Sequence, residues 1–516
     1  MPENFKELPE EIAVEEKITS AEESFELWRG RVGLFLGPAL FVLVVLLPFP
    51  ALSSPAHKLL AVLALVITFW ITEAVPIPAS ALLGALLCVV LGIGKDKEVL
   101  AHFADPIVFL FIGSFILAEG MKIHRLDKRI SYTILSSSWI KDKTSRLLLA
   151  IGFISAVISM WISNTATAAM VFPIALGVLR SLEDLETEGS GKVFSKYNTG
   201  VMLTVAYAAS IGGIATPVGT PPNLIGIGMI QNLIGYKITF FKWMLFGLPI
   251  TFVSFFVLFF LIRALHPTKR KKLQNLREYV MERKKSLGPW STGEKNTLIA
   301  FLVAVTLWVL PGFLAIFIGS ESKEMNFFST HLPEGIVALI AASLLFIMPV
   351  DFKKRKFTLT WKEASRIDWG TILLFGGGLT LGSLMFSTGL AEAIGNGLMS
   401  VFGASSQWGI TAIAIGLGII MSETTSNTAS ANMVIPIMIA ISKSSGVSPL
   451  PPALGACLGA SFGFMLPVST PPNAIVYSSG MVPITKMIRA GIIFDILGFL
   501  IILLSLRILC PALGLM

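Results

Sequence analysis

Charged residues are scarce in this 516-residue chain: they make up 14% of it, whereas 54% of the residues are hydrophobic. A soluble globular protein carries about 25% charged residues, so the composition argues against that class. Apolar runs of roughly 20 residues alternate with short polar breaks, and each run is long enough to cross a bilayer as a helix. A β-barrel would instead show alternating segments of about ten residues. We therefore expect an all-α polytopic membrane protein.

Cysteine and histidine are also rare, which limits the chemistry that the chain can perform. The three cysteines, Cys88, Cys457 and Cys510, lie in apolar runs and show neither a disulfide pattern nor metal-ligand spacing. None of the five histidines is spaced with a carboxylate or a cysteine as a metal site requires. With no candidate nucleophile or metal cluster, we expect no enzyme.

The N-terminal region lacks a basic segment that leads into an early apolar core, so we expect no cleavable signal peptide. Residues 1–30 are rich in glutamate, and we expect a soluble N-terminal tail on the cytoplasmic side, followed by a first transmembrane helix at 31–56. The net charge of +8 is assigned to loops that orient the spans. We predict a multi-pass protein of the cell inner (cytoplasmic) membrane that contacts the lipid bilayer and no nucleic acid.

The chain contains an internal repeat, a feature that defines architecture. The motif SNTAT begins at Ser163 and SNTAS begins at Ser426, 263 residues later. Similar apolar segments that begin at Asp105 and Asp368 are separated by the same interval. The repeat divides the remaining chain into three parts: a first repeat at 57–265, a basic cytoplasmic linker at 266–293 and a second repeat at 294–516.

Basic residues indicate that the two copies are inverted relative to each other. Segment 121–146 is rich in lysine and arginine, whereas its partner at 386–406 has none. One loop earlier the order is reversed, because 351–366 is strongly basic and its partner at 94–104 holds only two lysines. Basic loops stay cytoplasmic, so corresponding loops lie on opposite faces. Inverted repeats are typical of secondary transporters, whose sites lie where helices break near the bilayer midplane.

Each Ser-Asn-Thr motif lies in the middle of an apolar stretch, 147–179 or 410–441, that is too long for one span and too short for two. We therefore expect two re-entrant hairpins whose tips are the motifs. Free N–H groups and the positive end of the following helix suit a carboxylate. Asn and Ser oxygens and open carbonyls suit a small hard cation. A lone motif of this kind more often packs or hydrogen-bonds between helices, but the pairing favours a shared central site.

Two double prolines predict two unwound helices. GTPPN at 219–223 is matched by STPPN at 469–473, and a helix cannot continue through consecutive prolines. Each break would bare carbonyl oxygens that coordinate a cation, and Thr220 and Thr470 would offer hydroxyls to an anion.

Four carboxylates lie in or near apolar runs, where such residues are functional candidates. The sequence allows two roles equally for Glu73 and Glu423. Either the carboxylate has a function, in proton coupling or in balancing the charge of a cation, or it stabilises the fold. We interpret Glu334 and Asp495 as boundary or structural residues.

Four segments closely resemble the motifs of the divalent anion/sodium symporter family, which comprises bacterial dicarboxylate transporters and their animal relatives. These segments are SNTAT and ATPVGTPPN in the first copy, and SNTAS and MLPVSTPPNAIVY in the second. The resemblance covers the chain from about residue 32 to the end and implies about eleven spans with two re-entrant hairpins. It also implies a homodimer and an elevator movement that carries substrate and sodium together.

The resemblance places the substrate between the two tips, with residues of both breaks beside it. The implied substrate-binding residues are Ser163, Asn164, Thr165, Thr220, Pro221, Ser426, Asn427, Thr428, Thr470 and Pro471. One sodium site would use Ser159, Ser163, Asn164 and the Gly219 carbonyl, with Gly212 or Gly213 as alternatives if the register slips. The other would use Ser422, the Thr425 carbonyl, Asn427 and the Ser469 carbonyl.

Intact tips favour sodium-coupled symport of C4-dicarboxylates such as succinate, malate or fumarate. The alternatives are a sodium-independent dicarboxylate/α-ketoglutarate exchanger and a sulfate or citrate transporter on the same fold. An ion channel, from another class, would not need broken-helix cation sites.

Overall fold

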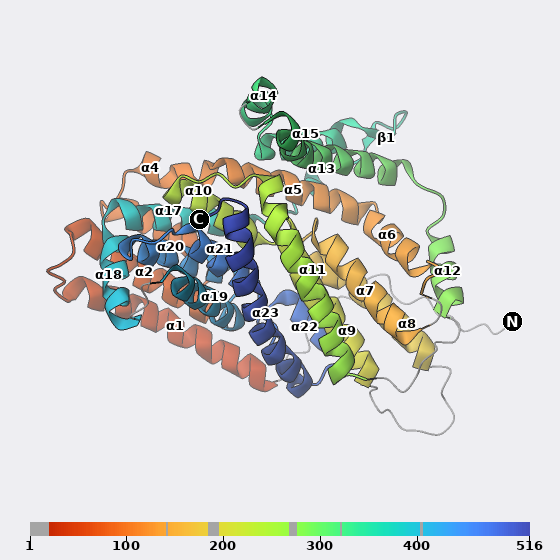
Figure 1. The fold of residues 1–516 in the computed structure, drawn as a ribbon, viewed down its shortest axis with the longest axis horizontal. Helices are drawn as coiled ribbons and strands as arrows, with labels where there is room; N and C mark the ends of the chain where they lie inside the picture. The colour runs from red at the N-terminus through yellow and green to blue at the C-terminus, as the bar shows by residue number, and fades with distance from the viewer. Residues whose placement is uncertain (1–19, 141–142, 184–195, 268–275, 320–321, 403–405) are drawn as a thin grey trace.

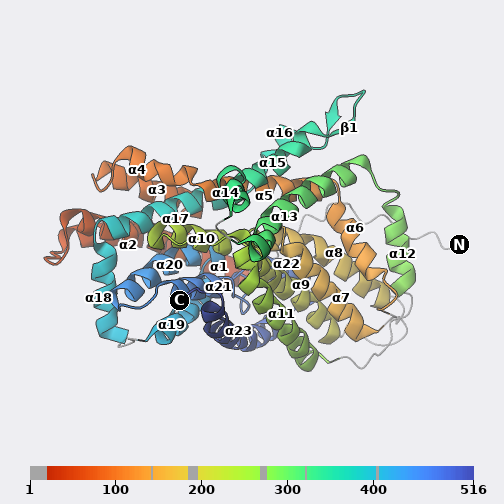
Figure 2. The same cartoon turned by 45° about the horizontal axis from the view of Figure 1, so that its top comes forward.

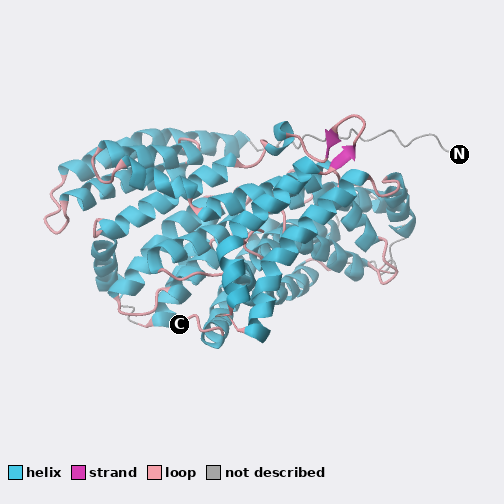
Figure 3. Ribbon diagram, turned by 90° about the horizontal axis from the view of Figure 1, so that it is seen from above, coloured by secondary structure: helices cyan, strands magenta, loops and turns pink. Residues whose placement is uncertain are grey.

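A computed structural model describes residues 20–140, 143–183, 196–267, 276–319, 322–402 and 406–516. Within these ranges the chain is almost entirely helical, and the only strands form one short antiparallel hairpin (Figure 3). The long helices α11 and α23 cross the middle of the molecule in contact with each other, with α7, α8 and α9 to one side and α17, α20 and α21 to the other (Figure 1). The prediction of an all-α protein is confirmed.

The elements of the first half are α1 (Ser20–Leu46), α2 (Ser54–Thr72), α3 (Ile77–Val90), α4 (Asp96–Ala101), α5 (Pro106–Ile123), α6 (Leu126–Leu135), α7 (Thr144–Ser159), α8 (Asn164–Glu183), α9 (Lys196–Gly212), α10 (Pro221–Ile234), α11 (Phe240–Leu265) and α12 (Leu276–Ser286), with 3₁₀ turns at His102–Ala104 and Gly213–Ala215.

The elements of the second half are α13 (Thr292–Ile318), α14 (Lys323–His331), α15 (Glu334–Ile347), β1 (Pro349–Asp351), β2 (Lys356–Phe357), α16 (Trp361–Ala364), α17 (Trp369–Ser387), α18 (Leu390–Phe402), α19 (Gln407–Thr424), α20 (Asn427–Ser444), α21 (Leu450–Gly459), α22 (Pro471–Tyr477) and α23 (Ile484–Ala512).

The N-terminal boundary differs from the prediction. Helix α1 begins at Ser20 and ends at Leu46, so part of the expected tail at 1–30 is helical and the expected first span at 31–56 starts and ends too late. Residues 1–19 lie outside the described ranges. The linker at 266–293 also contains structure, because α12 lies within it and contacts α6 and α8. Charged residues hid the first turns of α1 and the whole of α12, since a polar helical segment lacks the apolar run that marks a span.

Eight helices in the described part of the chain are long and apolar enough to cross a membrane, or nine if the bent pair α14 and α15 forms one span. The family resemblance led us to expect about eleven spans. The difference lies in apolar helices that are shorter than a span: α3, α7, α21 and the apolar part of α8. The short α7 and the short apolar part of α8 agree with a re-entrant hairpin, in which neither arm crosses the whole bilayer.

Helices α5 and α17, which occupy equivalent places in the two repeats, run in opposite directions. The segment before α5 lies against the end of α17, where Thr380 Oγ1 donates to the Val99 carbonyl at 2.9 Å. The segment before α17 lies at the end of α5, where His124 Nε2 is 2.6 Å from the Thr358 carbonyl oxygen. Phe111 and Phe375 meet where the helices cross, with 5.6 Å between ring centroids. This reciprocal arrangement is what inverted repeats require.

Candidate substrate and cation site

The first Ser-Asn-Thr motif forms the tip of a hairpin, between the end of α7 and the start of α8. Ser163 caps α8, because its hydroxyl oxygen accepts from the Ala166 N–H at 3.3 Å. Ser159, the last residue of α7, donates its hydroxyl to Asn164 Oδ1 at 2.7 Å. The amide Nδ2 of Asn164 points the other way and is 3.4 Å from Thr220 Oγ1. A single asparagine therefore joins the tip to the first double-proline motif.

The first break separates α9 from α10 by a 3₁₀ turn and by a second turn over residues 217–219. Thr220, the last residue before α10, has an extended backbone with φ −144° and ψ 141°. The prolines begin α10 instead of interrupting it, since the first turn of a helix has no use for their missing N–H groups. Asn223 fixes the break, because its Nδ2 donates to the carbonyls of Gly213 and Thr216, both at 2.8 Å.

Oxygen atoms of the tip and of the break converge around Gly213. A methyl group on Gly213 would overlap Asn164 Oδ1 and lie 3.1 Å from the Gly219 carbonyl oxygen. A methyl group on Gly219 would lie 2.8 Å from the Ser159 carbonyl oxygen. The cluster of backbone and amide oxygens has the ligand chemistry that hard cations prefer. The carbonyl of Gly219, the predicted ligand, and that of Gly213, one of the two alternatives, both belong to this cluster.

The second copy repeats this geometry. Ser422 donates to Asn427 Oδ1 at 2.7 Å, and Ser426 caps α20 by accepting from the Ala429 N–H at 3.2 Å. Thr470 has φ −144° and ψ 144°, and its prolines begin α22. Asn473 Nδ2 donates to the carbonyls of Gly463 and Leu466 at 3.2 and 3.0 Å.

An oxygen cluster also surrounds Gly463 in the second copy. A methyl group there would lie 2.7 Å from Ser422 Oγ and 3.0 Å from the Ser422 carbonyl oxygen. Two side chains differ from the first copy. The buried Thr470 hydroxyl has no hydrogen-bond partner, and Thr425 donates its hydroxyl to the Trp70 carbonyl at 2.9 Å, which ties the tip to α2.

Each break of one repeat contacts the hairpin of the other repeat through the helix that follows it. Helix α22, which follows the second break, packs on α8, which follows the first tip. Helix α10, which follows the first break, packs on α20 and α21, and Cys457 Sγ is 3.0 Å from the Pro222 carbonyl oxygen. Figure 2 shows α10 beside α20 and α22 beside α8, so each break lies against the hairpin of the other repeat.

The predicted site residues differ in exposure. Asn164, Thr220, Ser422, Ser469 and Thr470 are buried, whereas Thr165 and Pro471 are exposed. The remaining predicted residues lie between these extremes or are buried, namely Ser159, Ser163, Pro221, Thr425, Ser426, Asn427 and Thr428. In the first tip the buried Asn164 precedes the exposed Thr165, whereas Ser426, Asn427 and Thr428 of the second tip are all half-buried.

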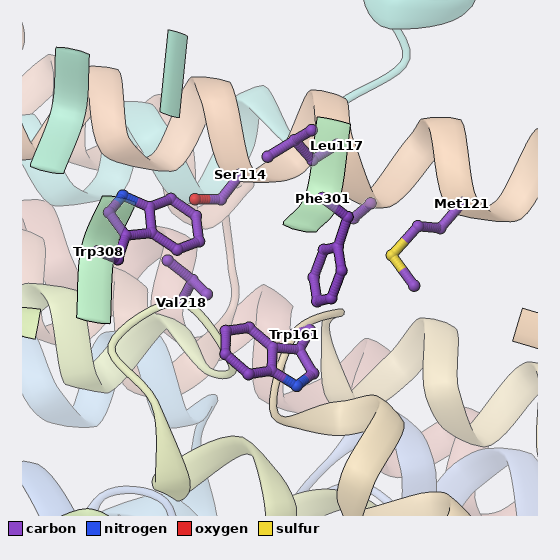
Figure 4. A pocket seen from close by; sticks show the side chains of 8 residues that line it. Ser114, Leu117, Met121, Trp161, Val218, Phe301 and Trp308 are labelled. Atoms are coloured by element: carbon purple, nitrogen blue, oxygen red, sulfur yellow. The ribbon is translucent and has the colours of Figure 1, made fainter. Parts of the chain in front are cut away.

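A small gap on the other side of the first tip is apolar (Figure 4). Trp161 of the tip and Val218 of the break face residues of α5 and α13, and the Trp161 ring meets Phe301 edge-on with 5.2 Å between centroids. Phe240 stacks on Trp308 at 4.7 Å beside it. This surface packs the hairpin against the outer helices and offers few polar groups, so the oxygen clusters are the better candidate site.

Three residues have roles that the sequence interpretation missed or misjudged. Asn223 and Asn473 hold the breaks in shape; their repetition in both copies was the available signal. Of the two roles predicted for Asp495, boundary or structural, the first is wrong, because Asp495 is 5% exposed in the middle of α23 and faces Glu423.

The remaining carboxylates are structural. Glu73 ends α2 in a left-handed conformation with φ 50°, is partly exposed and pairs with Arg29 at 3.4 Å. Glu334 begins α15 and accepts from the Phe240 N–H at 3.4 Å. Both fix helix ends, so among the intramembrane carboxylates only Glu423 and Asp495 lie close to a candidate site.

The family model described as the sodium:sulfate symporter transmembrane region matches residues 30–516. The chain belongs to this family. Relatives that resemble it include the sodium-dependent dicarboxylate transporter SdcS of Staphylococcus saprophyticus, which is 36% identical over 93% of this chain and 91% of its own length. SdcS of Staphylococcus aureus is 33% identical over the same shares. The chain is thus a multi-pass membrane transporter and not an enzyme, as predicted.

Two solved structures share the fold. The YdaH transporter of Alcanivorax borkumensis aligns with a TM-score of 0.53, at 13% identity, over 95% of this chain and 97% of its own. MtrF of Neisseria gonorrhoeae aligns with a TM-score of 0.51, at 12% identity, over 92% and 96%. The likeness covers the whole arrangement of helices and supports the transporter fold class.

Proposed function

We propose that this symporter-family protein couples sodium to the import of C4-dicarboxylates such as succinate, malate and fumarate across the cytoplasmic membrane. The observation that carries the proposal is the pair of matching tips, each with an oxygen cradle on one side and a helix N-terminus beside it. Relatives at 33 to 36% identity that are named sodium-dependent dicarboxylate transporters support it.

The two ends of the substrate match the two tips. One carboxylate would bind Ser163, Asn164 and Thr165, and the other would bind their counterparts in the second copy, Ser426, Asn427 and Thr428. Free N–H groups at the starts of α8 and α20 favour a negative charge there. Thr220 and Thr470 lie beside them with Pro221 and Pro471. No lysine, arginine or histidine occurs in 159–165, 213–223, 422–428 or 463–473, so the protein itself supplies no full positive charge at the site.

Sodium supplies that charge. One ion would lie among Ser159, Ser163, Asn164 and the Gly219 carbonyl, with the Gly213 carbonyl added by the geometry. The other would lie among Ser422, the Thr425 carbonyl, Asn427 and the Ser469 carbonyl. Oxygen ligands of this kind suit a hard cation.

The asparagine amides explain how the two cargoes depend on each other. When Asn164 Oδ1 coordinates sodium, its Nδ2 is left to donate on the opposite side, toward the substrate. Asn427 does the same in the second copy. Without sodium, a serine hydroxyl is the hydrogen-bond donor that holds each amide oxygen, Ser159 in the first copy and Ser422 in the second, so substrate would bind weakly. Transport by an elevator movement of a homodimer, with the N-terminal tail cytoplasmic, completes the proposal.

The test is uptake of labelled succinate into proteoliposomes under an inward sodium gradient, with choline as the substitute. Asn164→Ala and Asn427→Ala should each abolish sodium-driven uptake, because each removes a cation ligand and a substrate donor together. Asn326→Ala, at an exposed position in α14, is the matched control and should transport normally.

Other outcomes would identify a different transporter. Uptake that ignores sodium but needs dicarboxylate inside the vesicles would make the protein an exchanger and refute the proposed coupling. Sodium-driven uptake of sulfate or citrate in place of succinate would keep the coupling and replace the substrate, which the family description, sodium:sulfate symporter, makes a specific second candidate.

A further inference from the structure

Two carboxyl groups meet in the protein interior behind the second tip. Glu423, near the end of α19, is 3% exposed, and Asp495, in the middle of α23, is 5% exposed. Both side chains lie beside Phe464, because Glu423 accepts from the Phe464 N–H and Gly491, one turn before Asp495, packs on the Phe464 carbonyl. Carboxylates are almost never buried this deeply unless their charge is compensated.

Hydrogen bonds compensate Glu423 but not Asp495. The Oε1 atom of Glu423 accepts from the N–H groups of Phe464 and Met465 at 2.5 and 2.9 Å, and Oε2 accepts from the Ser469 hydroxyl at 2.5 Å. Both oxygens of Asp495 are buried without a hydrogen-bond donor at normal geometry. In the described part of the chain no lysine or arginine forms an ion pair with either carboxylate.

The surroundings of the pair are apolar. Phe462, Phe464 and Phe494 pack against one another with centroid distances between 4.9 and 5.9 Å. The neighbouring Tyr207 hydroxyl is already committed, because it donates to the Phe464 carbonyl at 2.6 Å. Two negative charges that face each other in such a region repel strongly, so a positive charge between them is strongly favoured.

The first copy has no such pair. Counting by the repeat, Glu423 corresponds to Met160 and Ser469 to Gly219. Gly247 packs on the backbone of residues 214 and 215 in the first break, and Gly491 packs on residues 464 and 465 in the second. Thr251 and Asp495 each lie four residues after these glycines, so Thr251 is the first-copy counterpart of Asp495. If the acids only stabilised a break, the first break would need them too, yet it forms the same geometry without them.

We propose that Glu423 and Asp495 bind a third monovalent cation, sodium in the transport cycle, between α19 and α23; this inference rests on the proposed sodium coupling. The free oxygens are those of Asp495, with Glu423 Oε2 and the Ser469 hydroxyl beside them. They are too few for a divalent ion such as calcium, which takes six to eight ligands. Because Ser469 also belongs to the second sodium cradle, the third ion links that cradle to α23.

The experiment measures the ratio of labelled sodium to labelled succinate taken up by proteoliposomes. Asp495→Asn keeps the shape but removes a charge, and it should lower the ratio by about one sodium per succinate. Asp495→Glu should keep the ratio, and the first-copy counterpart Thr251→Ala should not change it. A wild-type protein without sodium dependence would refute the proposed function before any variant is tested.

An active Asp495→Asn variant with the wild-type ratio would overturn the inference, because a shared proton or a hydrogen bond would then explain the pair. If the variant does not transport, equilibrium binding of labelled sodium to the purified protein decides. Loss of one bound sodium with the others retained supports the third site. An unchanged number of bound ions refutes it.

Discussion

At the scale of single residues, the glycines at the two breaks decide which atoms approach the tips. Gly213 and Gly463 occupy equivalent positions, and at each a methyl group would intrude among the oxygens of the tip. Neither has a left-handed backbone, so the reason for glycine is space and not conformation. A side chain at either position would occupy the place of the cation that we propose there.

Gly213→Ala and Gly463→Ala are therefore expected to reduce sodium-driven uptake at least about tenfold, since a loss of roughly 1.4 kcal/mol of cation binding already has that effect. Uptake assays over a range of sodium concentrations would show the half-saturating concentration rising. Gly416→Ala is the matched control in α19, because its methyl group would meet only Phe499 at 3.8 Å. Normal sodium dependence in both variants would mean that the cradles bind no cation.

Asn223 and Asn473 provide a second prediction at this scale. Asn223→Asp and Asn473→Asp would each remove two hydrogen bonds to backbone carbonyls and place a carboxylate next to the same two carbonyl oxygens. Because each lost bond costs about 1 kcal/mol and the unpaired charge costs more, we expect a loss of about 2–5 kcal/mol in stability. A lower Tm in detergent, followed by tryptophan fluorescence, checks this; Asn326→Asp, on the surface, should melt like the parent.

Much of the site could be predicted from the sequence, because each motif occurs twice. The repetition separated Asn164 and Asn427 from ordinary polar residues in helices. Asp495 was misjudged for the opposite reason: it occurs once, in an apolar run, and only tertiary packing places it beside Glu423, which lies 72 residues earlier.

At the scale of elements, the end of α11 is fixed against α9. His266 follows the last turn of α11, is buried, and packs on Gly200 of α9. Burial lowers the pKa of His266 to about 4, and the charge of Lys486 acts in the same direction. The imidazole is thus neutral in the folded protein at neutral pH.

This predicts a pH dependence of stability. The unfolded chain takes up a proton near pH 6.5, whereas the folded protein resists it until about pH 4. The contribution is therefore fully present above about pH 6.5 and is lost as the pH falls toward 4, by at most about 3 kcal/mol. His266→Gln should flatten this part of a plot of Tm against pH; an identical slope in the variant would show that His266 does not titrate there.

The elements themselves were predicted unevenly. Both hairpins and both breaks were expected, because proline and the polar tips mark them locally. The double prolines turned out to begin α10 and α22 instead of lying inside an unwound stretch, since missing N–H groups are tolerated in a first turn. Short helices such as α3 cannot be distinguished from full spans by apolar composition alone.

At the scale of the whole molecule, the inverted relation of the two repeats makes a prediction about sidedness. The segment before α5 and the segment before α17 lie at opposite ends of these antiparallel helices. Basic residues should keep the second of them in the cytoplasm.

Lys97→Cys and Lys354→Cys test this, since both positions are exposed. A membrane-impermeant maleimide should label Lys97→Cys in intact cells and Lys354→Cys only in inside-out vesicles. Cys88, Cys457 and Cys510 are buried and should give little background. Labelling of both positions from the same side would refute the inverted arrangement.

The cation site proposed at Glu423 and Asp495 has an electrical consequence. Fixed charges move outward and back and cancel over a complete cycle, so only the cargo contributes net charge. A dicarboxylate carries two negative charges, and two sodium ions would make the proposed cycle indifferent to membrane voltage. A third would move one positive charge inward, which a negative interior favours by about 2.3 kcal/mol per 100 mV. In that case the membrane potential, as well as the sodium gradient, would concentrate the substrate in the cell.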